Sequence, residues 1–127
     1  MDKIRVITKR PGGKPVHTWV TPSLENLQAY VGGCIETVTL ASDLVIICNE
    51  EGRLIGLPYN CNICGVSLVG DIIVCGVKGD KFADLPCSYG ELKRLLPDLW
   101  RDPPSSGCEQ TITRYDWKKA NFRTEHY

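Results

Sequence analysis

The segment from residue 43 to residue 48 most restricts the folds open to this chain, because it is nearly all aliphatic. It contains the longest uninterrupted apolar run in the sequence, residues 44–48. Apolar side chains on both faces of a strand are typical of the interior of a sheet that is covered on both sides. A run of this length is also far too short to cross a membrane. We therefore predict a central, buried strand over residues 43–48 and no association with a membrane.

The first twenty residues have the pattern of a β-hairpin. Apolar and polar side chains alternate over residues 3–9 and again over residues 16–20, as in strands that bury one face. Residues 10–14 between them are rich in Gly and Pro and favour a loop of about five residues. Residues 1–20 hold five basic side chains and one acidic one, whereas residues 21–100 hold ten acids and five bases. The sequence predicts a basic hairpin beside an acidic body.

A helix is predicted directly after this hairpin. Residues 21–22 are Thr-Pro, which supply a cap and a first-turn proline. Leu24, Leu27 and Val31 then follow at the spacing of one helical face. The two glycines at residues 32–33 favour a stop, since glycine readily adopts the left-handed conformation that ends helices.

Further β-rich segments and a second helix complete the predicted domain. Residues 34–40 and 72–77 are rich in β-branched side chains, and residues 53–55 follow a polar turn that suggests another hairpin. Ser88 and Glu91 form a capping-box pattern that predicts a short helix.

The predicted order β-β-α-β-β-β-α favours an α+β domain over residues 1–100. We expect a largely antiparallel sheet of about five strands, two helices and a C-terminal extension. Residues 101–127 begin as a linker that contains Pro and Ser, and continue as a tail that either docks or is flexible.

Seven cysteines are many for a chain that starts without an apolar leader, and their odd number argues against a disulfide framework. We expect reduced thiols in a cytoplasm. Cys61 and Cys64 have the spacing of a zinc-ligand pair, but a structural zinc site usually takes about four ligands. The further ligands would have to be recruited by folding from Cys48, Cys75, Cys87 or His17. We expect no metal and no cofactor, with Cys61 and Cys64 as the metal candidates.

The polar loops around the central strands form a candidate site, because loops at the ends of strands commonly carry function. Its residues are Asn49, Glu50, Glu51, Tyr59 and Asn60. The alternative is a geometric role, in which these side chains shape turns and cap backbone groups. The sequence has no phosphate-binding, dinucleotide-binding, metalloprotease or serine-hydrolase motif. We do not expect an enzyme; a hydrolase or redox enzyme that uses Glu50, Glu51 or the paired cysteines is a third hypothesis.

The hairpin and the tail hold the residues that we expect to bind a partner. Tryptophan is enriched at interface hot spots, and basic side chains speed association with an acidic protein surface. The candidates are Lys9, Arg10, Lys14, His17, Trp19, Tyr115, Trp117 and Phe122. The alternative for the hairpin is that its lysines only protect an edge strand from pairing.

Several short strings together resemble the domain-of-unknown-function family 3846 over about residues 3–98. They are SLENLQ at residues 23–28, VGG at residues 31–33, ICNEEG at residues 47–52 and GLPYN at residues 56–60. The resemblance implies a small protein of a bacteriophage or mobile element, a cytoplasmic location in the bacterial host, and no established enzyme activity.

Our leading hypothesis is a non-enzymatic binding protein that modulates or inhibits a host bacterial protein, such as a CRISPR or other defence effector. The alternative is a protein that binds or sequesters a small ligand such as a nucleotide signal. A large exposed apolar or charged patch would favour the first, and a deep pocket between sheet and helix the second. Direct binding to nucleic acid is not expected, because the formal net charge is zero.

Overall fold

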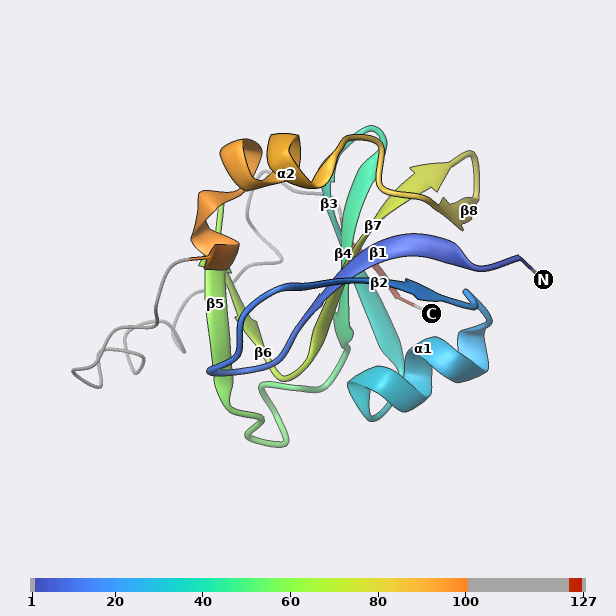
Figure 1. Cartoon of the computed structure of the whole chain (residues 1–127). Helices are drawn as coiled ribbons and strands as arrows, with labels where there is room; N and C mark the ends of the chain where they lie inside the picture. Colours follow the sequence, from blue (N-terminus) through green and yellow to red (C-terminus); the bar gives the residue numbers. More distant parts are fainter. Residues whose placement is uncertain (1, 101–123, 127) are drawn as a thin grey trace.

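The computed structural model describes residues 2–100 and 124–126 and confirms an α+β fold (Figure 1). The main sheet has seven strands in the order β2-β1-β7-β4-β3-β9, with β8 paired to β7, and its pairings are antiparallel. These strands are β1 (Ile4–Lys9), β2 (Val16–Val20), β3 (Ile35–Ala41), β4 (Leu44–Asn49), β7 (Ile72–Lys78), β8 (Lys81–Ala83) and β9 (Thr124–His126).

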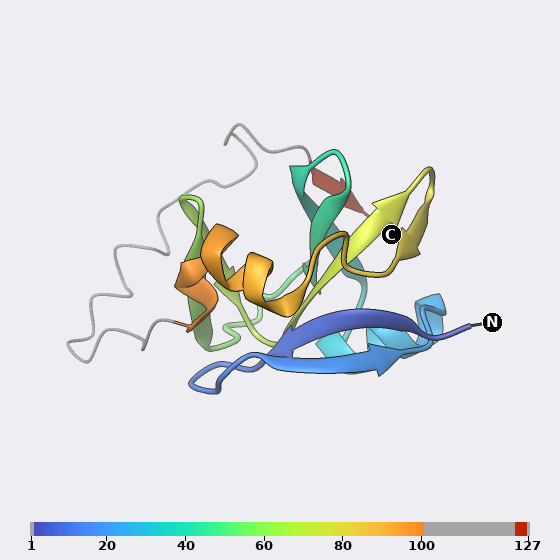
Figure 2. The same ribbon diagram turned by 45° about the horizontal axis from the view of Figure 1, so that its top comes forward.

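A smaller antiparallel sheet and two helices cover the main sheet. The small sheet consists of β5 (Tyr59–Ile63) and β6 (Val66–Val69). The helices are α1 (Leu24–Val31) and α2 (Tyr89–Leu95), and α2 is followed by a 3₁₀ turn, Pro97–Trp100. Figures 1 and 2 show α1 and α2 on opposite sides of the main sheet. The main sheet therefore has an apolar cluster on each face.

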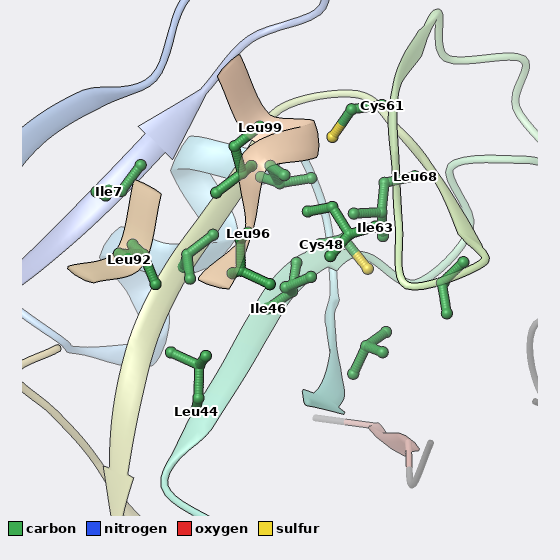
Figure 3. Close-up of a cluster of buried hydrophobic side chains, with 14 of the residues drawn as sticks. Ile7, Leu44, Ile46, Cys48, Cys61, Ile63, Leu68, Leu92, Leu96 and Leu99 are labelled. Atoms are coloured by element: carbon green, nitrogen blue, oxygen red, sulfur yellow. The ribbon is translucent and has the colours of Figure 1, made fainter. Parts of the chain in front are cut away.

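Strand β4 is buried along its whole length because its alternate residues enter both clusters. Val45 and Ile47 pack with Leu27 of α1 on one face. Ile46 points to the other face, where the larger cluster joins β1, β4 and β7 to α2 and to the small sheet (Figure 3). The predicted central strand over residues 43–48 is thus confirmed.

Both helices begin at a side-chain cap. The Ser23 hydroxyl accepts a hydrogen bond from the backbone N–H three residues later, so α1 starts after Ser23 and not at the predicted Thr21 cap. Gly32 ends α1 with a φ of 82°, as expected for a left-handed cap. The predicted capping box of Ser88 and Glu91 is present at the start of α2.

The strand predicted over residues 53–55 is wrong. This segment lies within a run of turns at residues 50–56, which is closed by a hydrogen bond from the Leu57 N–H to the Gly52 carbonyl at 2.9 Å. Leu54 is 85% exposed, so the apolar side chains that suggested a strand do not face a core. Gly52 permits the close return of the chain, because a Cβ there would lie 2.8 Å from the Val69 side chain. The strand instead begins later, at Tyr59.

Candidate functional site

Two of the predicted site residues, Lys9 and Asn60, form a buried pair. Lys9 in β1 is 2% exposed and Asn60 in β5 is 1% exposed. The Lys9 ammonium donates to Asn60 Oδ1 at 3.0 Å, and Asn60 Nδ2 donates to the carbonyls of Lys9 at 2.9 Å and Gly70 at 2.7 Å. The pair connects the main sheet to the small sheet.

Lys9 is therefore not part of an exposed basic hairpin, which corrects the expectation from sequence. Side chains alternate along β1, and Lys9 is on the same face as Ile7. Ile7 belongs to the larger apolar cluster, which the small sheet also joins. The position that sequence assigned to a solvated lysine is thus covered by β5.

Asn49 also has the geometric role that the sequence left open as an alternative. It is buried at the end of β4, where its Nδ2 donates to the Val31 carbonyl at 3.1 Å and its Oδ1 accepts from the Glu51 N–H at 2.7 Å. Asn49 thereby joins the end of α1 to the turn after β4. Glu51 is exposed in that turn, and Glu50 and Tyr59 are half-buried.

The paired cysteines lie in different environments. Cys61 is buried in the larger cluster, whereas Cys64 is exposed at the tip of the β5–β6 hairpin (Figure 3 shows Cys61). Cys64 and Gly65 form its two-residue loop and both have positive φ, 50° and 82°, as a type I′ turn requires. Within residues 2–100 and 124–126, no cluster of three or more His, Cys, Asp or Glu side chains suits a metal ion.

Burial controls the chemistry of the core thiols. It raises the pKa of Cys75 to about 12, and it also raises the pKa of Cys61 to about 12 against the opposing effect of the Lys9 ammonium. Burial, with a contribution from the nearby Glu36 carboxylate, raises the pKa of Cys48 to about 12. Because the thiolate is the nucleophile, these three cysteines are unreactive in the folded protein.

Strand β2 forms an outer edge of the main sheet and is not protected in the usual ways. Edge strands commonly carry lysine, proline or a bulge that prevents further pairing. β2 contains neither residue, and it pairs with β1 without a register shift from Val16 to Val20. Val16 is 55% exposed and Trp19 is 54% exposed. The cations expected to protect this edge lie elsewhere, with Lys9 in the core and Lys14 in the loop.

An aromatic row joins β2 to α2. The rings of His17 and Tyr89 meet edge to face with centroids 5.6 Å apart, and those of Tyr89 and Trp100 do so at 5.4 Å. Trp100 Nε1 also donates to the Tyr89 hydroxyl at 3.3 Å. His17 is exposed, so one end of this row reaches the surface beside the β2 edge.

Arg5 is a residue that the sequence did not single out. Its Nη2 donates to the carbonyls of Leu85 at 2.9 Å and Cys87 at 2.7 Å, and its Nη1 lies 3.3 Å from Nε2 of His17. Arg5 thus fixes the segment before α2 against β1. Its alternation with apolar neighbours was visible in the sequence, but its acceptors are about eighty residues away.

An open cleft of about 630 Å³ lies between α1 and the β1–β2 hairpin. The buried side chains of Leu27 and Ile73 form part of its lining. Lys3, Arg10 and Tyr30 also line it. The sequence did not predict this cleft, because it depends on how far α1 extends across the sheet.

The remaining predicted partner-binding residues, Tyr115, Trp117 and Phe122, lie outside the described residues. Arg10 and Lys14 are exposed in and beside the hairpin loop. In the part of the chain that is described, no helix has the length and apolar character needed to span a membrane.

Comparison with known protein families gives a match over most of the chain. The family model described as a domain of unknown function (DUF3846) matches residues 4–94. No curated protein and no solved structure matches the chain.

Proposed function

This chain belongs to the DUF3846 family, and we propose that it is a binding protein without catalytic activity. In this proposal a phage or mobile element encodes it, and it modulates or inhibits a host bacterial protein such as a CRISPR or other defence effector. Its place of action is then the host cytoplasm.

The observation that carries this proposal is the unprotected edge of β2. Among the described residues β2 pairs with β1 alone, and a regular, uncharged edge strand of this kind presents unpaired backbone N–H and carbonyl groups to another chain. Val16 and Trp19 flank these groups, and half of each side chain is exposed. Binding of an extended partner segment would supply backbone hydrogen bonds, and these two side chains would supply apolar contacts.

The charge around this edge favours an acidic partner. Arg10 and Lys14 are exposed at the hairpin loop, and the structure gives neither side chain a hydrogen bond or ion pair to any described residue. Such cations increase the rate of encounter with an acidic surface more than they increase the final affinity. The two residues therefore contribute to the choice of partner and to the rate of association.

Affinity capture from phage-infected bacterial lysate, with mass spectrometry, tests this proposal. The bait is the full chain, compared with a Val16→Lys/Trp19→Lys variant that introduces charge at the edge. A Leu54→Lys variant is the matched control, because Leu54 is also apolar and exposed but lies in the turn after β4. We expect the parent and the control to retain the same host protein and the edge variant to lose it. Equal capture by all three baits, or no enriched host protein, would overturn the proposal.

A further inference from the structure

The cleft beside α1 exists because α1 covers only part of one face of the main sheet. α1 packs chiefly on β3 and β4, and the sheet continues beyond it through β7 and β1 to β2. The uncovered region forms the cleft of about 630 Å³. Volumes of roughly 300–1,000 Å³ are typical of sites for small molecules.

Each end of the cleft has its own chemistry. One end contains Lys3, Thr21 and Asn26. Ile4 pairs with Val20, which brings the preceding Lys3 near the following Thr21, and Asn26 Nδ2 donates to the Thr21 carbonyl at 3.2 Å. The other end contains Arg10 and Asp71. Lys9 pairs with Ile72 in the antiparallel ladder, so Arg10, which follows Lys9, and Asp71, which precedes Ile72, lie at the same end of β1. Arg10 is seven residues after Lys3 along β1, and at a rise of about 3.3 Å per residue their Cα atoms are roughly 23 Å apart.

The charge of the lining favours an anion. Asp71 is the one acid among the lining residues, and it lies at the Arg10 end. Within the described part of the chain, the structure gives the Lys3 side chain no hydrogen bond or ion pair. The start of α1 is close to the Lys3 end, where the positive end of the helix dipole adds to the attraction for a negative group.

The middle of the cleft favours a flat apolar group. Leu27 and Ile73 are buried beneath it, and the Tyr30 ring is half-buried at its side. An aromatic ring can stack or pack edge to face on tyrosine and lose its contact with water against the aliphatic side chains. Asp71 and Arg10 would then be positioned to pair with polar groups on the edge of that ring.

We propose that this cleft binds a small organic anion that carries an aromatic ring system, as a nucleoside monophosphate does. The ring packs on Tyr30, and the phosphate lies at the end that contains Lys3 and Asn26. The cleft shares Trp19 and Arg10 with the proposed partner surface, whereas Lys3 and Asn26 are not part of the β2 edge, so substitutions at these two residues test ligand binding separately from partner binding.

Isothermal titration of the full chain with adenosine monophosphate, and separately with adenosine, tests the proposal. We expect the monophosphate to bind more tightly than the nucleoside. Lys3→Gln should weaken monophosphate binding by about fivefold or more, because it removes a charge-assisted contact to the phosphate. Asn26→Asp should weaken it as well, through repulsion of the phosphate. Neither variant should change the affinity for adenosine as strongly.

Lys14→Gln is the matched control, since it removes an exposed hairpin cation that does not line the cleft. It should bind the monophosphate as the parent does. Thermal unfolding of each variant verifies that the fold is retained. Absence of monophosphate binding at millimolar concentration would overturn the proposal. Equal affinity of the parent and Lys3→Gln for the monophosphate would also overturn it, as would a loss of affinity in Lys14→Gln as large as that in Lys3→Gln. Binding of an acidic peptide in place of both small molecules would also overturn it.

Discussion

The Lys9 ammonium donates to Asn60 Oδ1 at 3.0 Å, while the Asn60 amide donates back to the Lys9 carbonyl at 2.9 Å. These residues are 51 positions apart, and both are almost completely buried. A buried cation and a buried carbonyl each require a partner, because leaving either unsatisfied costs free energy. The pair therefore determines how the small sheet docks on β1.

Replacing Asn60 should destabilise the protein more than replacing its neighbour Asn62. Asn60→Ala removes the hydrogen bonds to the Lys9 ammonium and to the carbonyls of Lys9 and Gly70, so we expect the free energy of unfolding to fall by about 2–3 kcal/mol. Asn62→Ala in the same strand changes an exposed side chain and removes only the long hydrogen bond, 3.4 Å, that Asn62 Oδ1 accepts from the Ser67 hydroxyl, so the loss should stay below about 1 kcal/mol. Urea unfolding followed by circular dichroism measures both. Similar losses in the two variants would contradict the role of the buried pair.

The turn after β4 offers a second matched comparison. Asn49→Ala removes hydrogen bonds to the Val31 carbonyl and the Glu51 N–H, and should lower the free energy of unfolding by about 1–3 kcal/mol. Glu51→Ala alters an exposed carboxylate and should change it by less than about 0.5 kcal/mol. Thermal and urea unfolding give the two values. A large loss in Glu51→Ala would show that its carboxylate makes a stabilising contact.

Alkylation should distinguish the exposed cysteines from those in the core. Iodoacetamide should modify Cys34 and Cys64 first, because both are exposed. Cys48, Cys61 and Cys75 should react only on unfolding, since burial keeps them protonated and out of contact with the reagent. Peptide mass spectrometry at pH 8, with and without urea, follows each site. Rapid modification of Cys75 under native conditions would contradict its assignment to the core.

The raised pKa values of the three buried thiols predict how the free energy of unfolding depends on pH. Their pKa values are raised from 9.0 in the ordinary thiol to about 12 in the folded protein. Their contribution to the free energy of unfolding is fully present below about pH 9 and is lost as the pH rises toward 12. In that range the thiols of the unfolded chain release protons that the same thiols retain in the folded chain. Each thiol contributes a slope of up to about 1.4 kcal/mol per pH unit.

Urea unfolding between pH 8 and pH 10 measures this slope. Cys75→Ala lowers the overall stability but removes one titrating thiol, so its slope should be smaller than that of the parent. An identical slope in the two proteins would show that Cys75 does not contribute to the alkaline loss of stability.

The exposed cations of the hairpin loop should affect the rate at which a partner binds more than the lifetime of the complex. Once a partner is identified, Arg10→Glu with Lys14→Glu should lower the association rate constant by about tenfold or more at low salt, with a smaller effect at high salt. Surface plasmon resonance at several salt concentrations separates the two rate constants. Lys93→Glu with Arg94→Glu, at the end of α2, is the matched control. A loss confined to the dissociation rate would contradict electrostatic steering.

Local patterns in the sequence predicted much of the fold. The alternation in β1 and β2, the aliphatic strand β4 and the capping box of α2 each depend on neighbouring residues. β5 was missed because its sequence, Tyr-Asn-Cys-Asn-Ile, alternates polar side chains that read as loop. The strand predicted over residues 53–55 failed because exposed apolar side chains in a turn resemble those of a short strand.

The candidate site was harder to predict, because the burial and hydrogen bonds of its residues depend on partners that are far away in the sequence. Lys9 has the sequence context of an exposed edge residue, and only the docking of β5 shows that it is buried. Asn60 was assigned to a loop, although it satisfies backbone groups of two other segments. Trp19, in contrast, is exposed on an outer strand, as its position in a short alternating hairpin suggested.

The strand order of the main sheet ends in two edges of unequal length. On one side, β9 pairs with β3 and is itself the terminal strand, with three residues. On the other side, within the described residues, the terminal strand is β2, which has five residues and pairs with β1. A segment that extends the sheet can form more backbone hydrogen bonds along the longer edge. Strand addition therefore favours the β2 end, which would place the added segment next to the exposed cations of the hairpin loop.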